Sequence, residues 1–495
     1  MSSRPRRTLI ILLVAALLTA ACRPEREIAT SPPAAVRPNI VFVLVDDLSK
    51  NLVRYMPNVL ALQRDGTTFT NYTVTDSLCC PSRASMLTGR YPHNTGIVKN
   101  HGSDGGFRLF HRRGQERSTF ATDLQAAGYR TAFLGKYLNE YEPRKTVVAG
   151  KPYVPPGWDQ WFAGGNDYAN VNYTLNENGR LRWYGTRPQD YLTDVLSAKA
   201  RKFITSTAAE GKPFLVEVST YAPHRPYRPA PRDAASFPGL TAPRTAAFGR
   251  VPVNAPKWLA RHSPLTSAQL RHIDYNFRRR VQSVQAVDRM IGDLRATLTK
   301  AGIAGRTLVV FSSDNGYHMG EYRLAPGKQT AFDLDVNVPL VAAGAGVKVG
   351  QVISAVVENV DLRPTFADLA GTTVPAHVDG RSIRPLLAGG IPALWRRAAL
   401  IEHSDPATDP ADPDYTRFTE NIPPAYEALR TSSFTYVEYV DGGREYYDRR
   451  SDPHQMLNLV AKLAPGRLSE LSAALHGLAT CEGASTCWPA ARAVS

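Results

Sequence analysis

The chain has 495 residues and a net charge of +15, because 59 lysines and arginines outnumber 44 aspartates and glutamates. Hydrophobic residues make up 43% and charged residues 21% of the sequence, an ordinary globular mixture. This composition excludes a disordered chain, a collagen-like fibre and a disulfide-dense miniprotein. There is one long apolar run, which excludes a multispanning membrane protein. The positive charge suits an anionic substrate, a nucleic acid or an anionic lipid surface.

The N-terminus has the pattern of an export signal. Three arginines within the first seven residues precede the uncharged run 9–21, which is shorter than the ~20 residues that span a bilayer. Small residues then lead to Cys22, as in a bacterial lipobox, although Thr19 stands where that motif usually has leucine. We expect a signal peptide over 1–22, with Cys22 either lipidated or removed by ordinary cleavage nearby, and a flexible tether over 23–37. The folded part should lie outside the cytoplasm, attached to the cell envelope or secreted.

Four further cysteines fall into two pairs. Cys481 and Cys487 are six residues apart and can close a short disulfide loop in an oxidising compartment. Cys79 and Cys80 are adjacent, and adjacent cysteines rarely bridge each other without strain. The second pair therefore needs another explanation.

Buried strands alternate with helices along most of the chain. Apolar runs of mostly β-branched residues, without polar alternation, predict strands that are buried on both faces. Amphipathic patterns ending near glycines predict the helices. The expected strands are 39–45, 129–134, 214–218 and 307–311, and the expected helices are 120–127 and 267–300. This alternation predicts an α/β fold with a largely parallel central sheet, in which ligands bind at the carboxyl ends of the strands.

The later part of the chain differs from the earlier part in composition and in its predicted elements. Residues 225–265 are rich in Pro, Arg and Ala and are expected to form a long surface insertion. Tyr, Thr and Val around a Gly-Gly pair predict a small antiparallel sheet over 426–447, and a terminal helix follows at 466–478. We therefore expect a larger domain over 38–395 and a smaller α+β subdomain over 396–495.

Two pairs of oxygen-bearing side chains follow predicted strands. Asp46 and Asp47 end the first strand, and Asp314 and Asn315 follow the strand at 307–311. Together they could place hard oxygen ligands around one divalent cation, Ca²⁺ or Mg²⁺. Neighbouring side chains on a strand point in opposite directions, so both members of a pair reach one ion only if the chain turns there. Taken singly, each pair also fits ordinary turn chemistry.

The run 79–90 places a nucleophile-type side chain, Cys79, just ahead of a predicted helix. Pro81 suits the first helical turn. The N–H groups at a helix N-terminus suit an anionic ligand, and the guanidinium of Arg83 matches sulfate or phosphate oxygens. The alternative is a buried structural cysteine pair before a core helix.

These residues resemble the signature of the type I sulfatases, in which the same types stand in the same order: Cys79, Pro81, Ser82, Arg83, Thr88, Gly89 and Arg90. Further segments resemble other parts of that family and follow in its order over about residues 38–460. They are the opening metal strand at 39–47, the lysine turn at 135–137, the histidine loop at 222–226, the second metal loop at 313–316, Lys328 and the C-terminal segment at 445–459. Segments 78–85, 91–94, 134–141 and 316–318 resemble the N-acetylglucosamine-6-sulfatase branch.

The resemblance implies an alkaline-phosphatase-like fold, with the larger domain as the catalytic one. It implies that a separate maturation enzyme oxidises Cys79 to formylglycine and that the site binds Ca²⁺, with Mg²⁺ as the alternative. The implied metal ligands are Asp46, Asp47, Cys79, Asp314 and Asn315. The implied catalytic residues are Cys79, Arg83, Lys136, His224 and Lys328.

The implied chemistry divides the reaction into two steps. Hydrated formylglycine is a geminal diol, so one hydroxyl can attack sulfur and the other can then expel sulfate. Arg83, Lys136 and Lys328 would stabilise charge on the transferred group. His224 would protonate the leaving alcohol.

One position departs from the arylsulfatase pattern. Arylsulfatases have a histidine two residues after the lysine of the Gly-Lys turn, where it assists the elimination of sulfate, whereas this chain has Leu138. We therefore consider His93 and His318 as candidates for that step and as substrate-binding residues.

The sequence thus predicts an exported sulfatase that hydrolyses sulfate esters, with 6-O-sulfated N-acetylglucosamine-type sugars or sulfated polysaccharides as substrates. Two alternatives remain: a phosphodiester or phosphonate hydrolase of the same fold, and a non-catalytic anion- or glycan-binding surface lipoprotein with an inert Cys79. Nucleic acid is not expected as a partner, because zinc-finger spacing and aromatic RNA-binding motifs are missing. The cluster Arg278–Arg280 is expected on a solvated helix face.

Overall fold

The computed structural model describes Met1 and residues 37–405, 410, 412, 414–415 and 422–494. It divides the chain into the units Met1–Val36 and Arg37–Ser495, and the fold below is that of the second. The expected signal peptide, the tether up to residue 36 and Cys22 lie outside the described residues. In the part of the chain that is described, no helix has the length and hydropathy needed to cross a membrane.

A ten-stranded sheet forms the centre of the folded unit. Its order is β13-β2-β12-β11-β1-β10-β4-β7-β8-β9, and the middle strands β11, β1, β10, β4 and β7 are mutually parallel. The bounds are β1 Asn39–Val45, β2 Gly66–Phe69, β4 Arg130–Lys136, β7 Gln160–Gly164, β8 Tyr173–Glu177, β9 Arg180–Tyr184, β10 Phe214–Ser219, β11 Thr307–Ser313, β12 Leu340–Gly344 and β13 Gln351–Ile353. The predicted α/β class and its four strands are confirmed, with β1 at the predicted bounds.

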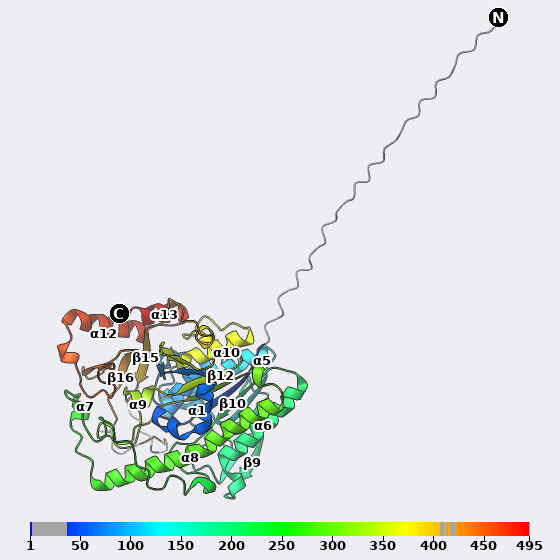
Figure 1. Cartoon of the computed structure of the whole chain (residues 1–495), viewed down its shortest axis with the longest axis horizontal. Coiled ribbons are helices and arrows are strands. Elements are labelled where there is room, and N and C mark those ends of the chain that lie inside the picture. The colour runs from blue at the N-terminus through cyan, green and yellow to red at the C-terminus, as the bar shows by residue number, and fades with distance from the viewer. Residues whose placement is uncertain (2–36, 406–409, 411, 413, 416–421, 495) are drawn as a thin grey trace. The chain divides into compact units, whose positions relative to one another are not determined.

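Helices cover both faces of this sheet (Figure 1). Successive side chains of a strand point to opposite faces. Alternate residues of β1 from Ile40 to Leu44 pack with helices α2, α5 and α10, and those from Val41 to Val45 pack with α1, α6 and α8. The helices are α1 Pro57–Arg64, α2 Cys79–Thr88, α5 Phe120–Ala126, α6 Leu192–Glu210, α8 Ser267–Lys300 and α10 Leu362–Ala370. The predicted helices at 120–127 and 267–300 are confirmed, whereas α6 had no prediction.

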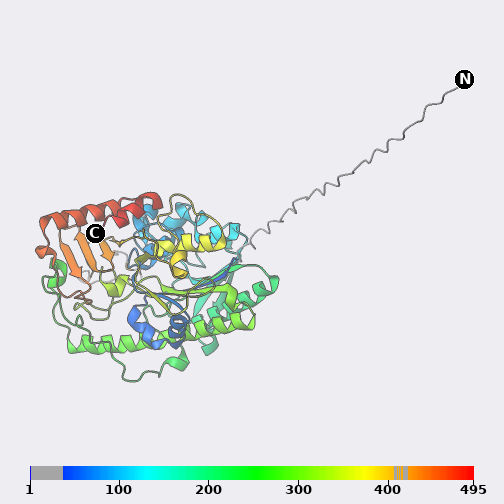
Figure 2. The same cartoon turned by 45° about the horizontal axis from the view of Figure 1, so that its top comes forward.

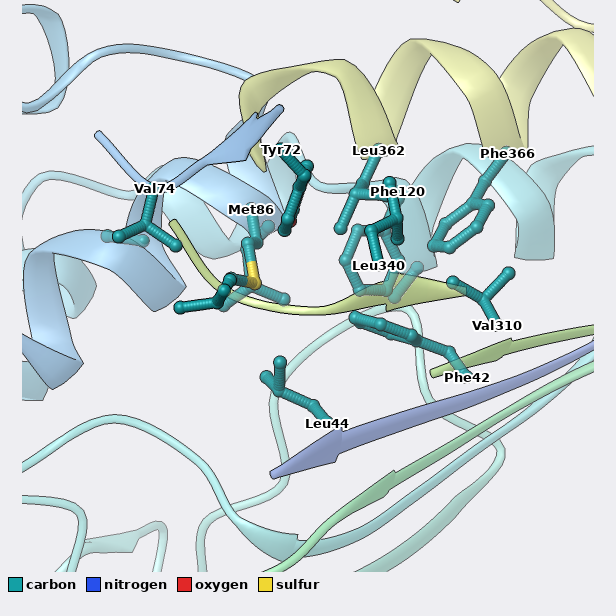
Figure 3. Close-up of a cluster of buried hydrophobic side chains, with 14 of the residues drawn as sticks. Phe42, Leu44, Tyr72, Val74, Met86, Phe120, Val310, Leu340, Leu362 and Phe366 are labelled. Carbon is teal, nitrogen blue, oxygen red and sulfur yellow. The ribbon is translucent and has the colours of Figure 1, made fainter. Parts of the chain in front are cut away.

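Aromatic and aliphatic side chains together fill the face under α5 and α10 (Figure 3). Phe42 lies edge-on to Phe366 with ring centroids 5.6 Å apart, and Phe366 meets Phe120 at 5.5 Å. Such pairs add about 0.5–1.5 kcal/mol each beyond the area they bury. This packing holds β1 in a rigid sheet and so gives the residues at its carboxyl end a fixed position.

A smaller antiparallel sheet and the helix α12 follow, as expected for the C-terminal part, and a second helix, α13, had no prediction (Figure 2). Its elements are β15 Ala398–His403, β16 Tyr426–Thr431, β17 Phe434–Tyr439, β18 Arg444–Asp448, α12 Pro465–Ala479 and α13 Ala484–Arg492. Cys481, just after α12, and Cys487, within α13, form a disulfide, so the short loop that their spacing allows is closed. Tyr91 and Val360 of the larger part belong to the same apolar cluster as this sheet. The boundary between residues 395 and 396 stays a prediction.

Shorter elements connect these layers. They are β3 Tyr72–Thr73, β5 Val147–Val148, β6 Lys151–Pro152, β14 Val357–Glu358, α3 Pro92–Thr95, α4 Gly106–Arg112, α7 Lys257–Ala260, α9 Asp333–Val336 and α11 Arg384–Leu387. The insertion expected over 225–265 holds α7 and the single helical turn Pro231–Asp233, with no strand.

Candidate active site

The parallel strands end together at one edge of the sheet, and the predicted site residues gather there. Asp46 and Asp47 follow β1, and Asp314 and Asn315 follow β11, its parallel neighbour. Lys136 is the last residue of β4. Because parallel strands place their carboxyl ends on the same side, residues far apart in sequence meet here.

The pairs Asp46–Asp47 and Asp314–Asn315 are in direct contact. The backbone N–H of Asp47 donates to Asp314 Oδ1 at 3.1 Å, and Asn315 Nδ2 donates to Asp47 Oδ1 at 2.7 Å. Asp47 has a left-handed backbone, with φ of 62°. This turn takes the chain out of the strand alternation, which is the condition under which both aspartates can face one point.

The arrangement of oxygens fits a divalent cation. Asp47 Oδ2 and Asn315 Oδ1 are buried and have no hydrogen-bond partner among the described residues. Buried oxygens without partners are costly unless another group satisfies them. One donor atom from each of Asp46, Asp47, Cys79 and His224 lies within 4.8 Å of the others. Carboxylate and amide oxygens are the ligands preferred by Ca²⁺ and Mg²⁺.

Cys79 is the first residue of α2 and lies against this cluster. Its Sγ is 2.9 Å from Lys328 Nζ and 3.4 Å from Asp46 Oδ1. Burial and the charge of Asp46 raise the pKa of the Cys79 thiol well above its usual value. Cys80 instead belongs to the apolar core, where burial raises its pKa to about 12. The two adjacent cysteines therefore have different environments, and one of them faces the site.

Three cations neutralise the carboxylates. Lys136 Nζ is 2.7 Å from Asp46 Oδ2, Lys328 Nζ is 2.7 Å from Asp47 Oδ1, and Arg83 Nε is 2.8 Å from Asp314 Oδ2. Burial by itself would lower the lysine pKa values, but the neighbouring carboxylates raise both well above the usual value. Arg83 Nη2 is buried without a partner among the described residues, so one donor of this guanidinium is available to an anion.

His224 completes the cluster after β10. Its Nδ1 is 2.7 Å from the Arg225 carbonyl oxygen, which leaves Nε2 facing the carboxylates, 3.6 Å from Asp47 Oδ2. Burial lowers the pKa of His224, but the nearby carboxylates outweigh burial and raise it above the usual 6.5. The ring therefore tends to hold a proton on Nε2, the nitrogen that faces Asp47 and Asp414.

Asp414 is a site residue that sequence reasoning missed. Its carboxylate lies 3.0 Å from Lys328 Nζ and 3.4 Å from His224 Nε2, and it accepts a hydrogen bond of 2.9 Å from Asn100 Nδ2. The feature of the sequence that could have indicated Asp414 is the acidic stretch 405–414, in which Asp-Pro occurs three times. Asn100 carried no such signal.

The two candidate histidines are placed differently. His93 lies 2.8 Å from Glu402 Oε1 through one ring nitrogen and 2.8 Å from the Cys481 carbonyl oxygen through the other, so both its nitrogens are engaged away from Cys79. His318 is buried, 3.0 Å from Asp335 Oδ2, and lines the cavity described below. The structure thus brings His318, but not His93, towards the site.

The expectation of a solvated face for Arg278–Arg280 is wrong for one residue. Arg280 is 1% exposed, because it falls on the same helical stripe as Phe277 and Val284. Its Nη2 donates to the Asp47 carbonyl oxygen, and its guanidinium lies over the Tyr317 ring, 4.3 Å from the centroid. Arg280 thus supports the turn that orients a predicted metal ligand.

A cavity of about 510 Å³ adjoins the cluster. Asp47, His224, Lys328 and Asp414 form part of its wall. Residues of α8 and of the segment 325–329 form other parts. A ligand that fills this cavity therefore contacts the cluster residues in its wall.

Comparison with known proteins agrees with this site. Residues 38–372 match the sulfatase family, and residues 320–478 match the C-terminal part of N-sulphoglucosamine sulphohydrolase. The fold and site thus define an alkaline-phosphatase-like hydrolase of sulfate esters. The chain belongs to the sulfatase family.

Two relatives and two solved structures resemble this chain along most of its length. N-acetylglucosamine-6-sulfatase of Homo sapiens is 34% identical over 474 residues, covering 90% of this chain and 85% of the relative. The extracellular sulfatase SULF-1 homolog of Drosophila melanogaster is 35% identical over 74% of this chain and 33% of its own length. A structure solved with its substrate D-glucosamine-2-N,6-O-disulfate has a TM-score of 0.74 and 25% identity, over 89% of this chain and 97% of the other. The phosphonate monoester hydrolase of Silicibacter pomeroyi, at 23% identity and TM-score 0.67 over 88% and 93%, shares the fold.

Proposed function

We propose that this sulfatase removes the 6-O-sulfate from N-acetylglucosamine-type sugars of sulfated polysaccharides. The observation that supports this most strongly is the 34% identity to N-acetylglucosamine-6-sulfatases along 90% of the chain. The relative solved with a 6-O-sulfated glucosamine supports the same class of substrate.

Our proposal assigns a cation to the carboxylate cluster. Asp46, Asp47, Asp314, Asn315 and residue 79 would hold it, with Ca²⁺ ahead of Mg²⁺. The unpartnered Asp47 Oδ2 and Asn315 Oδ1 support this assignment, because a cation would satisfy both. When bound, the cation supplies positive charge that polarises the sulfate oxygens and the nucleophile.

Residue 79 is proposed to be formylglycine in the active enzyme, made from Cys79 by a maturation enzyme. The hydrated aldehyde supplies a hydroxyl nucleophile. The contacts of residue 79 with Lys328 and Asp46 support this position as the reacting one. Cys80, whose side chain is in the apolar core, has no part in this proposal.

The surrounding cations would bind the transferred group. The cluster carboxylates lie within hydrogen-bond distance of Lys136, Lys328 and Arg83. Arg83 Nη2 has no hydrogen-bond partner among the described residues, so it can donate to a sulfate oxygen. Preorganised donors of this kind stabilise charge that develops in a transition state. His224 would donate its Nε2 proton to the leaving sugar oxygen, since that nitrogen faces the cavity side.

We also propose that the enzyme is exported, either lipid-anchored through Cys22 or secreted after cleavage nearby. The disulfide between Cys481 and Cys487 supports an oxidising compartment. Metabolic labelling with a palmitate analogue distinguishes the two forms: a labelled chain whose label is lost in Cys22→Ser is anchored, and an unlabelled chain in the medium is secreted.

One experiment tests the function. The chain is produced with and without a formylglycine-generating enzyme, residue 79 is examined by peptide mass spectrometry, and a panel of sulfated sugars is assayed beside phosphodiester model esters. We expect 6-sulfated N-acetylglucosamine to be hydrolysed only by the converted protein. Cleavage of phosphodiesters but not of sulfate esters would instead support the phosphonate hydrolase alternative. Binding of sulfated glycan by a persistent thiol, without turnover, would support the non-catalytic one.

A further inference from the structure

The outer end of the central sheet carries exposed apolar side chains. β9 is the last strand of the sheet, pairs with β8, and lies at the periphery of the folded unit (Figure 1). Trp183 is 62% and Leu181 is 45% exposed. Both project from the same face, because alternate side chains of a strand point the same way. An edge strand with exposed apolar side chains is a surface on which another molecule can bind.

The hairpin of β5 and β6 extends this surface. β6 lies beside β9. Asn176, which lies opposite Leu181 on β8, donates from Nδ2 to the Tyr153 carbonyl oxygen at 2.8 Å, so the chain just after β6 lies on the Leu181 face of the sheet. Val147 and Val148, the two residues of β5, are each 49% exposed. Apolar residues that gather on a surface in this way mark interaction sites, whereas scattered ones are ordinary.

Three cations accompany these apolar residues. Lys145 precedes β5 by two residues, Lys151 opens β6, and both are exposed. Arg144 donates from Nη2 to Thr174 Oγ1 at 2.8 Å. Thr174 lies opposite Trp183 in the sheet, so this guanidinium is near the exposed indole. We use the name β9 surface for Val147, Val148, Leu181 and Trp183 together with these three cations.

The charge of this edge favours an anionic partner. Arg180 and Arg182 alternate with the apolar residues of β9 and are exposed on its other face. A second copy that paired through β9 would bring these arginines together, and like charges opposite each other destabilise a pair of strands. Glu177, at the end of β8, is paired and lies 2.9 Å from Lys199 Nζ. The β9 surface therefore attracts an anionic molecule more readily than another copy of the chain.

The apolar part of the surface favours lipid over polysaccharide. Valine and leucine side chains form no hydrogen bonds with the hydroxyl groups of a sugar, whereas they can enter the acyl region of a bilayer. Tryptophan and basic residues are the types found where proteins meet the interface of a membrane. The combination at β9 therefore fits an anionic phospholipid surface.

The chain before the folded unit is long enough for this contact. It enters the fold at Arg37, just before β1, and β9 is five strands away in the sheet, roughly 24 Å at about 4.8 Å per strand. The proposed tether from the anchor at Cys22 to residue 36 can span up to ~50 Å when extended. An anchored chain can therefore bring the β9 surface to the bilayer.

We propose that the β9 surface docks the folded unit on anionic phospholipid, with Trp183 and Leu181 in the membrane interface and the three cations at the headgroup phosphates. This inference goes beyond the proposed function and uses the proposed anchor only to bring the surface near a bilayer. A lipid anchor on a tether limits the distance of the enzyme from the membrane, and the second contact fixes its orientation. Because that contact is then intramolecular, the two together bind more tightly than either does by itself.

The test measures whether Trp183 enters a bilayer. The full exported chain carrying Cys22→Ser is mixed with vesicles of phosphatidylglycerol and phosphatidylcholine whose acyl chains carry bromine, a short-range quencher of tryptophan fluorescence. The same chain with Trp183→Phe gives the contribution of the other tryptophans. We expect the difference, which is the Trp183 signal, to be quenched by the anionic vesicles and to recover in high salt, because salt screens surface charge.

Lys145→Glu with Lys151→Glu reverses two charges of the β9 surface. A cation near an anionic membrane contributes about a factor of five to binding, so the lipid concentration that gives half of the quenching should rise roughly 30-fold or more. Arg261→Glu with Arg271→Glu is the matched control, because both arginines are exposed outside this surface and the net charge changes equally. This control should stay within about twofold of the parent curve, because charges more than a Debye length from the bilayer are screened.

Unquenched Trp183 in the presence of anionic vesicles would overturn the proposal, as would equal quenching by phosphatidylcholine alone or by the lysine variant. A change in Trp183 emission with sulfated dextran but not with vesicles would assign the surface to a polysaccharide instead. Dimers in light scattering that disappear in the lysine variant would assign it to a second copy. These outcomes leave the proposed substrate untouched, since only hydrolysis tests it, and the labelling of Cys22 tests the anchor separately.

Discussion

Arg280→Met removes the buried cation behind the Asp47 turn and keeps an unbranched apolar side chain of similar length. The wild-type side chain donates from Nη2 to the Asp47 carbonyl oxygen and lies over Tyr317. A charge-assisted hydrogen bond contributes about 1.5–3 kcal/mol, and a buried cation–π contact about 1–2 kcal/mol. Arg280 Nε and Nη1 are buried without partners in the described part of the chain, and removing them relieves a desolvation cost. The net loss in the free energy of unfolding should therefore be only about 1–2 kcal/mol.

The larger effect should fall on cation binding. A left-handed backbone at a non-glycine residue such as Asp47 costs about 1–3 kcal/mol and persists only when its surroundings hold it. Without Arg280 the turn can relax, and the Asp46 and Asp47 carboxylates then lose their common orientation. We expect the affinity for Ca²⁺ to fall about 10- to 100-fold, equivalent to about 1.4–2.8 kcal/mol.

Calorimetric titration of chelator-treated protein with Ca²⁺ measures this directly, and chemical unfolding without the cation reports the stability term. Arg279→Met is the control, because Arg279 is only half-buried and its bond of 3.2 Å runs to Gln282. Wild-type Ca²⁺ affinity in a folded Arg280→Met protein would refute the supporting role given to Arg280.

Three further predictions concern the cluster and the core. Cys79→Ser should abolish turnover in the co-expression system, and full activity of this variant would contradict the assignment. Cys80→Ser should keep turnover but lower the free energy of unfolding by about 1–3 kcal/mol, because it buries a hydroxyl in the apolar core. Asp314→Ala should lose bound metal and activity together. It should also lose about 3–5 kcal/mol of stability, because Arg83 loses its ion-pair partner. Unchanged metal content, measured by atomic emission, would exclude Asp314 as a ligand. Burial lowers the pKa of His403 to about 3, so between pH 6.5 and 3 the unfolded chain binds a proton that the folded one does not, and stability falls as pH falls. From pH 6.5 to 5 this group should remove about 1.6 kcal/mol, because the unfolded histidine is already half-protonated at pH 6.5. His403→Phe, compared with the wild type by urea unfolding at both pH values, should lack that part of the decline.

Local patterns predicted four strands of the central sheet, the helices at 120–127 and 267–300, and a candidate for the reacting group. An uninterrupted apolar run is enough to predict β1, because a strand covered by helices on both faces needs apolar side chains in both directions. The resemblance of the run from Cys79 to Arg90 to the type I sulfatase signature, together with the other segments that resemble that family, predicted the site. The structure places Cys79 beside Asp46 and Arg83 beside Asp314, and it brings the pairs 46–47 and 314–315 into contact with each other.

Tertiary structure decided what local patterns could not encode. Asp414 reaches the cluster from a segment distant in sequence, where it contacts Lys328 and Asn100, and neither Asp414 nor Asn100 follows a predicted strand. Arg280 is charged in a charged run, so only its register on α8 against the sheet shows that it is buried under Asp47. The cavity likewise forms where α8 meets the segment 325–329. The spacing of apolar side chains along a helix or strand depends on a few neighbouring residues and can be read from the sequence. These contacts depend instead on how whole helices and strands pack against one another, and a single sequence does not display that packing.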